Sequence, residues 1–211
     1  MGKISRGILG GFSGKVANVV GSSWKGIAYM KSLPLSVANP RTSGQIAQRT
    51  KFANTVAFAS EILSTIIKPL WDRFAQSQSG YNAFVQANID LFEGALASPP
   101  EDLKISQGKM DSTAITLIEA EAGSSNISVD WPQDGGEGLK LDTDLAYFLL
   151  VNETQGNFGV LAGTKTRDGE DPAVAMPTAL VAGDVMRGYL AFKRADGTVV
   201  SNTAYATEVS Q

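Results

Sequence analysis

The sequence predicts an α+β protein in three parts: a basic N-terminal arm with a β-hairpin (residues 1–41), a central helical pair (42–98) and a C-terminal antiparallel β-sandwich (99–211). Three observations support this prediction. The first 52 residues contain basic side chains and no acidic ones. Apolar residues then recur at helical spacing as far as Phe92, and beyond Asp102 they alternate with a period of two. The chain therefore changes character twice.

The charge distribution is the most uneven property of the chain. The net charge of −3 conceals a leading segment with eight Lys and Arg residues, because the first carboxylate is Glu61. The remaining residues hold the other 10 of the 18 basic side chains and all 21 acidic ones. A basic arm of this kind binds polyanions or acidic protein surfaces, and one such surface is the acidic body of a neighbouring copy.

Composition argues against several classes of function. The chain has no Cys and no His. These absences exclude disulfides, thiolate nucleophiles, the most common metal ligand and the Ser-His-Asp triad. We therefore expect a protein that is not an enzyme and that has no cofactor and no metal centre. The 43% hydrophobic content is enough to build a core.

The arm begins with five glycines in residues 2–14, a pattern that predicts mobility until a partner is bound. Strands are predicted at residues 15–20 and 24–31, with a turn at Gly21-Ser22-Ser23. Alternation along the second strand places Trp24, Gly26, Ala28 and Met30 on one face and Lys25, Ile27, Tyr29 and Lys31 on the other.

Two helices are predicted next. The first is capped by Thr42 or Ser43, and its apolar residues form one buried stripe: Phe52, Val56, Ala59, Leu63, Ile66 and Leu70. Pro69 should kink or restart this helix because it lacks an N–H group. The second runs from about Ser79 to Phe92, and Pro99-Pro100 marks a domain boundary.

The C-terminal part predicts seven or eight short strands, a number typical of an immunoglobulin-like or fibronectin type III sandwich, with Trp131 as its core anchor; a small barrel is the alternative. The predicted strands are residues 103–110, 113–119, 126–131, 145–152, 158–164, 174–181, 185–194 and 199–209.

This part of the chain contains two kinds of candidate ligand site: clustered carboxylates and aromatic rings. Carboxylates at Asp142 and Asp144, and around Gly169 (Asp168, Glu170, Asp171), suit calcium chemically but lack the twelve-residue loop pattern, so solvated loops are the preferred interpretation. Exposed Tyr147, Phe158 or Tyr205 would provide stacking surfaces for a sugar-binding or adhesive module.

Several motifs resemble those of an uncharacterised family of Bacteroidota proteins found among phage and prophage genes. They are Gly10-Gly11-Phe12-Ser13-Gly14-Lys15-Val16, Trp24-Lys25-Gly26, Asn39-Pro40-Arg41-Thr42 with Gln45, Gln48, Arg49 and Phe52, Gly80-Tyr81-Asn82-Ala83-Phe84, and Ile105-Ser106-Gln107-Gly108. The resemblance covers most of the chain and implies a context, a phage particle, rather than a mechanism.

Together these observations predict a virion structural protein for head decoration, the neck or the tail. We expect it to be made in the bacterial cytoplasm, to have no membrane span and to bind other virion proteins or copies of itself. Nucleic acid is the alternative partner, because lysines beside aromatic rings can grip a strand. The residues predicted to contact the partner are Lys3, Arg6, Phe12, Lys15, Trp24, Lys25, Lys31, Arg41, Gln45, Gln48 and Arg49.

Overall fold

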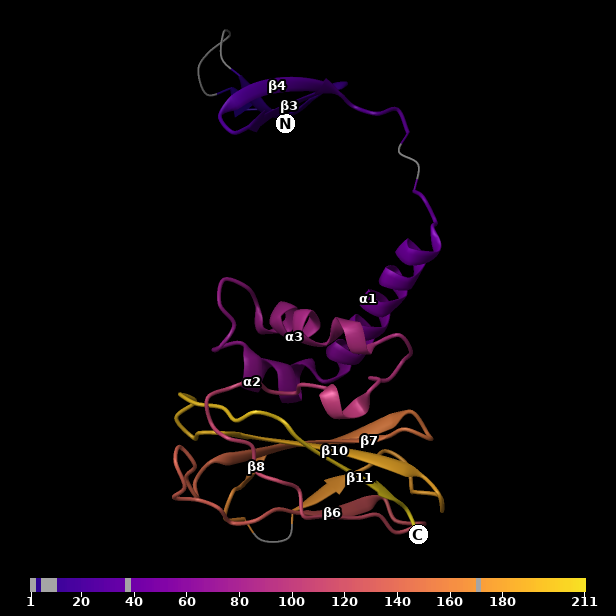
Figure 1. Ribbon diagram of the computed structural model, residues 1–211, viewed down its shortest axis with the longest axis vertical. Coiled ribbons are helices and arrows are strands. Elements are labelled where there is room, and N and C mark those ends of the chain that lie inside the picture. The colour runs from indigo at the N-terminus through magenta and orange to yellow at the C-terminus, as the bar shows by residue number, and fades with distance from the viewer. Residues whose placement is uncertain (1–2, 5–10, 37–38, 170–171) are drawn as a thin grey trace. The chain divides into compact units, whose positions relative to one another are not determined.

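The computed structural model describes residues 3–4, 11–36, 39–169 and 172–211. The chain divides into two compact units, Met1–Thr42 and Ser43–Gln211 (Figure 1). In its described residues the first contains strands and no helix, and the second contains helices and antiparallel sheets. The predicted α+β class is therefore confirmed. Residues on both sides of the boundary predicted at 98/99 share one hydrophobic core in the second unit.

The first unit is a four-stranded antiparallel sheet in the order β1-β2-β3-β4. Its strands are β1 (Lys3–Ile4), β2 (Phe12–Val16), β3 (Val19–Trp24) and β4 (Ile27–Ser32). Lys25 and Gly26 form the tight turn between β3 and β4, with φ values of 48° and 84°. Two consecutive positive φ values are typical of a type I′ turn, whose twist matches that of the flanking strands.

This sheet corrects the predicted hairpin. Gly21-Ser22-Ser23 lies inside β3 and is not a turn. Gly21 is needed there because the carbonyl oxygen and the ring of Phe12 lie over it, so that a Cβ atom would come within 2.2 Å of that oxygen. Because the turn is at 25–26, Trp24 pairs with Ile27 and lies on the face opposite to Ala28 and Met30.

The helical part of the second unit starts with α1 (Ser43–Glu61), continues through a π-helical turn (Leu63–Ile67) and restarts as α2 (Lys68–Trp71). Pro69 lies in the first turn of α2, so the predicted restart is confirmed. The predicted buried stripe is wrong at its start, since the Phe52 side chain is exposed. Burial begins only at Thr55, one turn later.

Helix α3 (Gly80–Asn88) is capped by Ser79, whose hydroxyl accepts a hydrogen bond from the Asn82 N–H. Short 3₁₀ turns follow at Ile89–Leu91 and Pro100–Asp102. The buried Asn88 at the end of α3 donates to the Lys104 carbonyl at 3.1 Å and accepts from the Lys104 N–H at 2.9 Å. This pair of bonds ties the helix to the segment that leads into the strands.

Seven strands form two antiparallel sheets, in the orders β11-β10-β7-β8 and β5-β6-β9. They are β5 (Leu117–Glu119), β6 (Asn126–Asp130), β7 (Leu145–Asn152), β8 (Asn157–Thr166), β9 (Ala173–Ala175), β10 (Val185–Lys193) and β11 (Ala204–Val209). The bounds of β7 are those predicted from the sequence. In β6, buried Ile127 and Val129 alternate with exposed neighbours, as predicted for a strand with one wet face.

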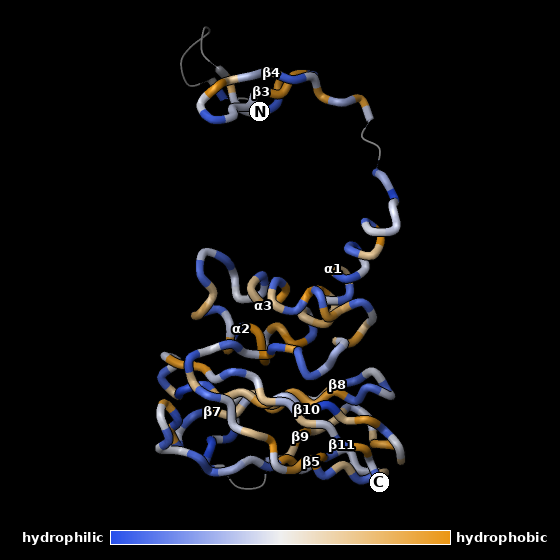
Figure 2. The backbone as a smooth tube through the Cα atoms, viewed as in Figure 1, coloured by the Kyte–Doolittle hydropathy of each residue, from blue (hydrophilic) through white to orange (hydrophobic). Residues whose placement is uncertain are grey.

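The two cores of the second unit lie on opposite faces of the larger sheet. One core joins the helices to side chains such as Leu149 and Ala191, and the other joins β5, β6 and β9 to side chains such as Phe148 and Leu190. Figure 2 shows hydrophobic segments gathered where these layers meet. Consequently, β7 is buried on both faces along nearly its whole length.

Residues 103–110 do not form the predicted strand. Their backbone is held mainly by side chains: the Ser106 N–H donates to the Thr203 hydroxyl at 3.0 Å, and the Gly108 N–H donates to the Asn202 side chain at 3.2 Å. The Trp71 indole N–H also donates to the Ile105 carbonyl at 2.8 Å. The alternating pattern here reflects the burial of Leu103 and Ile105 against the helices, without a strand ladder.

Candidate partner-binding surface

The N-terminal sheet exposes most of its apolar side chains. The exposed fractions of Trp24, Ile27 and Met30 are 63%, 66% and 70%. Gly21 is the only buried residue among those of the first unit that the structure describes. A small sheet gains stability by burying one face, so an uncovered sheet of this kind is typical of a docking element.

One face of this sheet combines positive charge with apolar and aromatic groups. Cross-strand pairing places Lys15, Val20 and Lys31 in one row across β2, β3 and β4. Tyr29 and the Trp24–Ile27 pair follow along the same face. We call Lys15, Lys31, Trp24, Ile27 and Tyr29 the cationic face.

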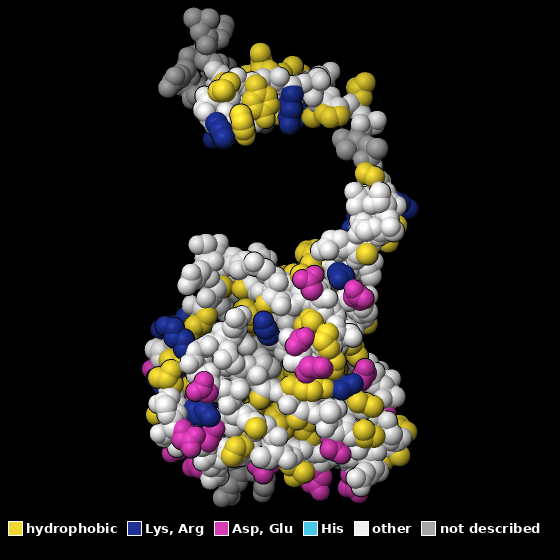
Figure 3. All heavy atoms as spheres, viewed as in Figure 1, with side chains coloured by type: hydrophobic (Ala, Val, Ile, Leu, Met, Phe, Trp, Pro, Cys, Tyr) yellow, Lys and Arg dark blue, Asp and Glu magenta, His cyan; other side chains and the backbone are white. Residues whose placement is uncertain are grey.

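The opposite face of the sheet has no charged side chain in the described residues. It consists of Phe12, Val16, Val19, Ala28 and Met30 together with two glycines. Phe12 lies over Gly21 and is half-buried. We call this the uncharged face. Figure 3 shows hydrophobic and basic side chains side by side on the N-terminal sheet, in the view drawn.

The turn between β3 and β4 adds a third positive charge next to the cationic face. The Lys25 ammonium lies 4.9 Å from the centroid of the Trp24 ring. A cation over an aromatic ring is stabilised by the ring's quadrupole, although an exposed pair contributes only modestly. The contact positions the indole, so that a flat apolar surface and a positive charge are presented together.

The structure separates the predicted partner-binding residues into groups. Lys3, Phe12, Lys15, Trp24, Lys25 and Lys31 belong to the sheet, and Arg41 is exposed in the segment that follows it. Gln45, Gln48 and Arg49 are exposed on the first half of α1, in the second unit. Arg6 lies outside the described residues. The structure therefore brings the six sheet residues together in one small element.

Sequence reasoning missed some residues of this surface. Val16, Val19 and Ile27 are exposed apolar residues of the sheet that were not predicted to contact a partner. They were missed because the turn was placed at residues 21–23. The usable signal was Lys25-Gly26, a dipeptide suited to a two-residue turn, which places Trp24 and Ile27 opposite each other.

Of the expected sugar-stacking residues, one is buried and two are only partly exposed. Tyr147 is 7% exposed and belongs to the core beneath the helices. Phe158 and Tyr205 pack against the same core. The prediction that these rings are exposed is wrong for Tyr147, because the helices cover the sheet face that a free sandwich would leave open.

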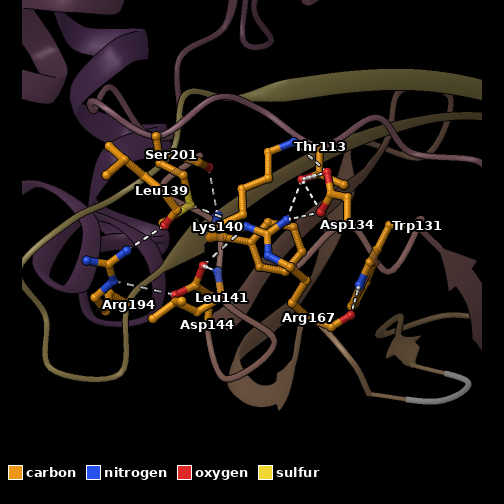
Figure 4. A network of polar contacts seen from close by, with 12 residues as sticks. Thr113, Trp131, Asp134, Leu139, Lys140, Leu141, Asp144, Arg167, Arg194 and Ser201 are labelled. Carbon is orange, nitrogen blue, oxygen red and sulfur yellow. Dashed lines mark hydrogen bonds and ion pairs between the residues drawn. The ribbon is translucent and has the colours of Figure 1, made fainter. Parts of the chain in front are cut away.

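The most prominent polar cluster surrounds Arg167, which is fully buried (Figure 4). Its guanidinium forms ion pairs with Asp134 and Asp144 and lies 3.8 Å from the centroid of the Phe192 ring. Burial alone would raise the pKa of Asp134, but hydrogen bonds from Lys140, Thr113 and Arg167 outweigh it and lower the pKa. Through Asp134, the cluster connects Lys140 and its loop to Arg167, which directly follows β8.

The Asp144 carboxylate is part of this cluster, where it pairs with Arg167. Its side chain accepts a hydrogen bond from the Leu141 N–H at 2.8 Å. Within the described ranges, no group of three or more His, Cys, Asp or Glu side chains could hold a metal ion. Glu170 and Asp171, part of the second acidic group considered for calcium, lie outside those ranges.

A comparison with protein families identifies the family of the chain. A family model described as a family of unknown function (DUF6266) matches residues 11–207. No curated protein matches the sequence. Along the described part of the chain, no helix is long and apolar enough to cross a membrane.

Proposed function

The chain belongs to the DUF6266 family, and we propose that this member is a multi-copy structural component of a bacteriophage particle, as a head decoration, neck or tail protein. In this proposal the N-terminal sheet is the anchor and the second unit is the displayed body. The partners are other virion proteins or copies of the chain itself, and the site of action is the virion, after synthesis in the bacterial cytoplasm.

One observation carries the proposal: the N-terminal sheet has apolar side chains on both faces, and among its described residues only Gly21 is buried. Aromatic and aliphatic groups exposed to this degree gain free energy when a partner removes them from water. The second unit, by contrast, has two buried cores and needs no partner to cover its sheets. This division of roles suits a docking element joined to a folded body.

The charge distribution supports a protein partner for the anchor. The first unit contains six Lys and Arg residues and no carboxylate, while residues 43–211 hold all 21 acidic side chains. Opposite charges on two surfaces accelerate encounter and select the correct partner. The phage context itself comes from the motif resemblance given above, which extends over most of the chain.

For the body we propose an immunoglobulin-like sandwich of the fibronectin type III kind. The first, second and fifth of its seven strands (β5, β6, β9) form one sheet, and the third, fourth, sixth and seventh form the other. This order supports the assignment, since immunoglobulin-like folds divide their strands between two sheets in a similar way. Trp131, buried at the end of β6 and packed edge-on against Phe192, suits the role of core anchor.

We also propose that the role is binding rather than catalysis. The residue types that most often act as general bases or nucleophiles, His and Cys, are missing from the sequence. The charged groups of the Arg167 cluster are engaged with each other in the interior, where a substrate would have to displace them. A building block is the simpler function for this combination.

The test is a deletion of residues 1–32 in the phage that encodes the chain. We expect the remaining chain to fold, because its cores lie entirely in the second unit, but to be missing from purified particles. Mass spectrometry of the particles measures incorporation, and circular dichroism of the purified variant checks its folding. Normal incorporation of a folded variant would refute the anchor role.

A nucleic-acid contact is the second candidate, favoured by the cationic face. Lysines next to Trp24 and Tyr29 on a sheet provide both charge and stacking platforms for bases. This alternative predicts an affinity for single-stranded DNA or RNA that falls steeply with salt. A filter-binding titration at low ionic strength without detectable binding would remove it.

A further inference from the structure

A groove of about 370 Å³ runs between β5 and β11 in the second unit. Its lining is Leu117, Ile118, Glu119, Ala120, Glu121, Glu208, Val209 and Gln211. The groove thus combines three carboxylates with apolar side chains, and no Lys or Arg lines it. In Figure 3, acidic side chains lie along the end of the second unit where Figure 2 places β5 and the C-terminus.

The three carboxylates of the groove are not neutralised by a basic side chain among the described residues. Glu119, Glu121 and Glu208 form no ion pair with any described residue of the chain. Glu93 and Glu153, on other surfaces, are paired with Lys51 and Arg187. Unpaired carboxylates grouped around an apolar surface repel one another, so a positively charged occupant would stabilise the groove.

The apolar part of the groove is equally uncovered. Leu117 and Val209 are 49% and 50% exposed. β5 is an edge strand, and its ladder in the described sheet is formed with β6 alone. An uncovered edge strand offers backbone hydrogen bonds to an incoming strand, which makes it a common place for one sheet to join another.

The cationic face of the N-terminal sheet has the matching chemistry. It presents Lys15 and Lys31 beside Trp24, Ile27 and Tyr29, where the groove presents glutamates beside Leu117 and Val209. β4, the outer strand of that sheet, is exposed along all six residues and can pair edge to edge. The cationic face and the groove therefore have opposite charges, each has exposed apolar side chains, and each lies beside an edge strand.

We propose that the groove between β5 and β11 of one copy receives the N-terminal sheet of a second copy. This inference rests on the proposed function and identifies the partner of the anchor as the chain itself. The contact joins two different surfaces, so repetition builds a ring if the rotation closes and a filament if it does not. Both outcomes suit a repeated component of a particle.

The experiment compares three full-length proteins by sedimentation velocity over a range of concentrations: the wild type, the groove variant E119Q/E121Q/E208Q and the control E61Q/E101Q/E137Q. The control removes the same number of exposed carboxylates outside the groove. We expect the wild type and the control to self-associate in a salt-sensitive manner. The groove variant should show about a tenfold higher dissociation constant, because three partly exposed pairs each contribute a few-fold.

A mixing experiment fixes the direction of the contact. The groove variant E119K/E121K/E208K and the sheet variant K15E/K31E should each associate weakly alone. When the two are mixed, they should associate. The basic groove of the first variant then meets the acidic sheet of the second, and the unaltered basic sheet of the first meets the unaltered acidic groove of the second. Heterodimers formed only in the mixture support the proposal, and failure to form them under conditions where the wild type associates overturns it.

The remaining outcomes are decisive as well. A wild type that stays monomeric at every concentration, or a groove variant that associates like the control, overturns the proposal, and so does binding of single-stranded DNA without self-association. Incorporation into particles separates the two levels of inference. If the 1–32 deletion is excluded while E119Q/E121Q/E208Q is incorporated normally, the groove assignment fails and the anchor role stands. If the deletion variant is incorporated, the anchor role itself fails.

Discussion

The N-terminal sheet and the β11-β10-β7-β8 sheet are built from similar residues but differ in what covers them. Both are antiparallel and rich in aliphatic and aromatic side chains. The larger sheet is covered on one face by helices and on the other by β5, β6 and β9. In the part of the N-terminal sheet that the structure describes, nearly all side chains remain accessible. Strand composition alone therefore does not distinguish a sheet that is covered from one that is left exposed.

The largest expected effect tests the covered sheet. Phe148→Ala removes a fully buried ring from the core between the two sheets. We expect the free energy of unfolding to fall by about 4 kcal/mol, because a large cavity replaces the ring. Urea unfolding monitored by circular dichroism measures the change. Phe148→Leu, which keeps most of the volume, should cost less than half as much, and equal costs would show that the site is not tightly packed.

An intermediate effect is expected at the Arg167 cluster. Asp134→Asn leaves the buried guanidinium with one charged partner fewer, and we expect a loss of about 2 kcal/mol at neutral pH. Hydrogen bonds hold the pKa of Asp134 below its ordinary value of 3.8 in the folded protein. The stabilisation is therefore complete above that value and disappears as the pH falls through the lower, folded-state pKa.

The pH dependence gives this prediction its control. The stability of the wild type should decline below about pH 4 more steeply than that of Asp134→Asn, so the two curves converge in acid. Parallel curves would show that the carboxylate charge contributes nothing beyond the shape of the side chain.

The smallest effect on stability is expected in the uncovered sheet. Trp24→Ala should change the unfolding free energy of the second unit by less than about 0.5 kcal/mol, because this indole belongs to neither of its cores. Incorporation into particles should nevertheless fall at least about tenfold, since buried aromatic anchors dominate interfaces. Trp24→Phe should restore part of it. A loss of unfolding free energy as large as that of Phe148→Ala would show that Trp24 is packed as tightly as a core residue, which contradicts the difference between the two sheets.

The fold was predictable where local pattern and final environment agree. β7 was predicted at its observed bounds because an apolar run between Asp144 and Asn152 fits a fully buried strand. The restart at Pro69 followed from the missing N–H group. Phe52 is exposed although the sequence predicts that it is buried. The spacing of apolar residues shows which side of a helix faces the core, but not where along the helix the core begins.

The candidate site was predictable in its residues but not in its geometry. The absence of carboxylates before Glu61 singles out the lysines of the arm, yet the common face of Lys15 and Lys31 depends on turns at 17–18 and 25–26. The Arg167 cluster had no local signal, because its members are brought together from distant loops. Gly21 was read as a turn residue, although it is required by the close approach of Phe12.

The position of Met30 in the uncharged face has a chemical consequence. Its thioether is accessible, while those of Met110, Met176 and Met186 are shielded in the second unit. Oxidants convert accessible thioethers to polar sulfoxides. Among the methionines that the structure describes, Met30 should therefore be oxidised first, and its sulfoxide would make the uncharged face more polar.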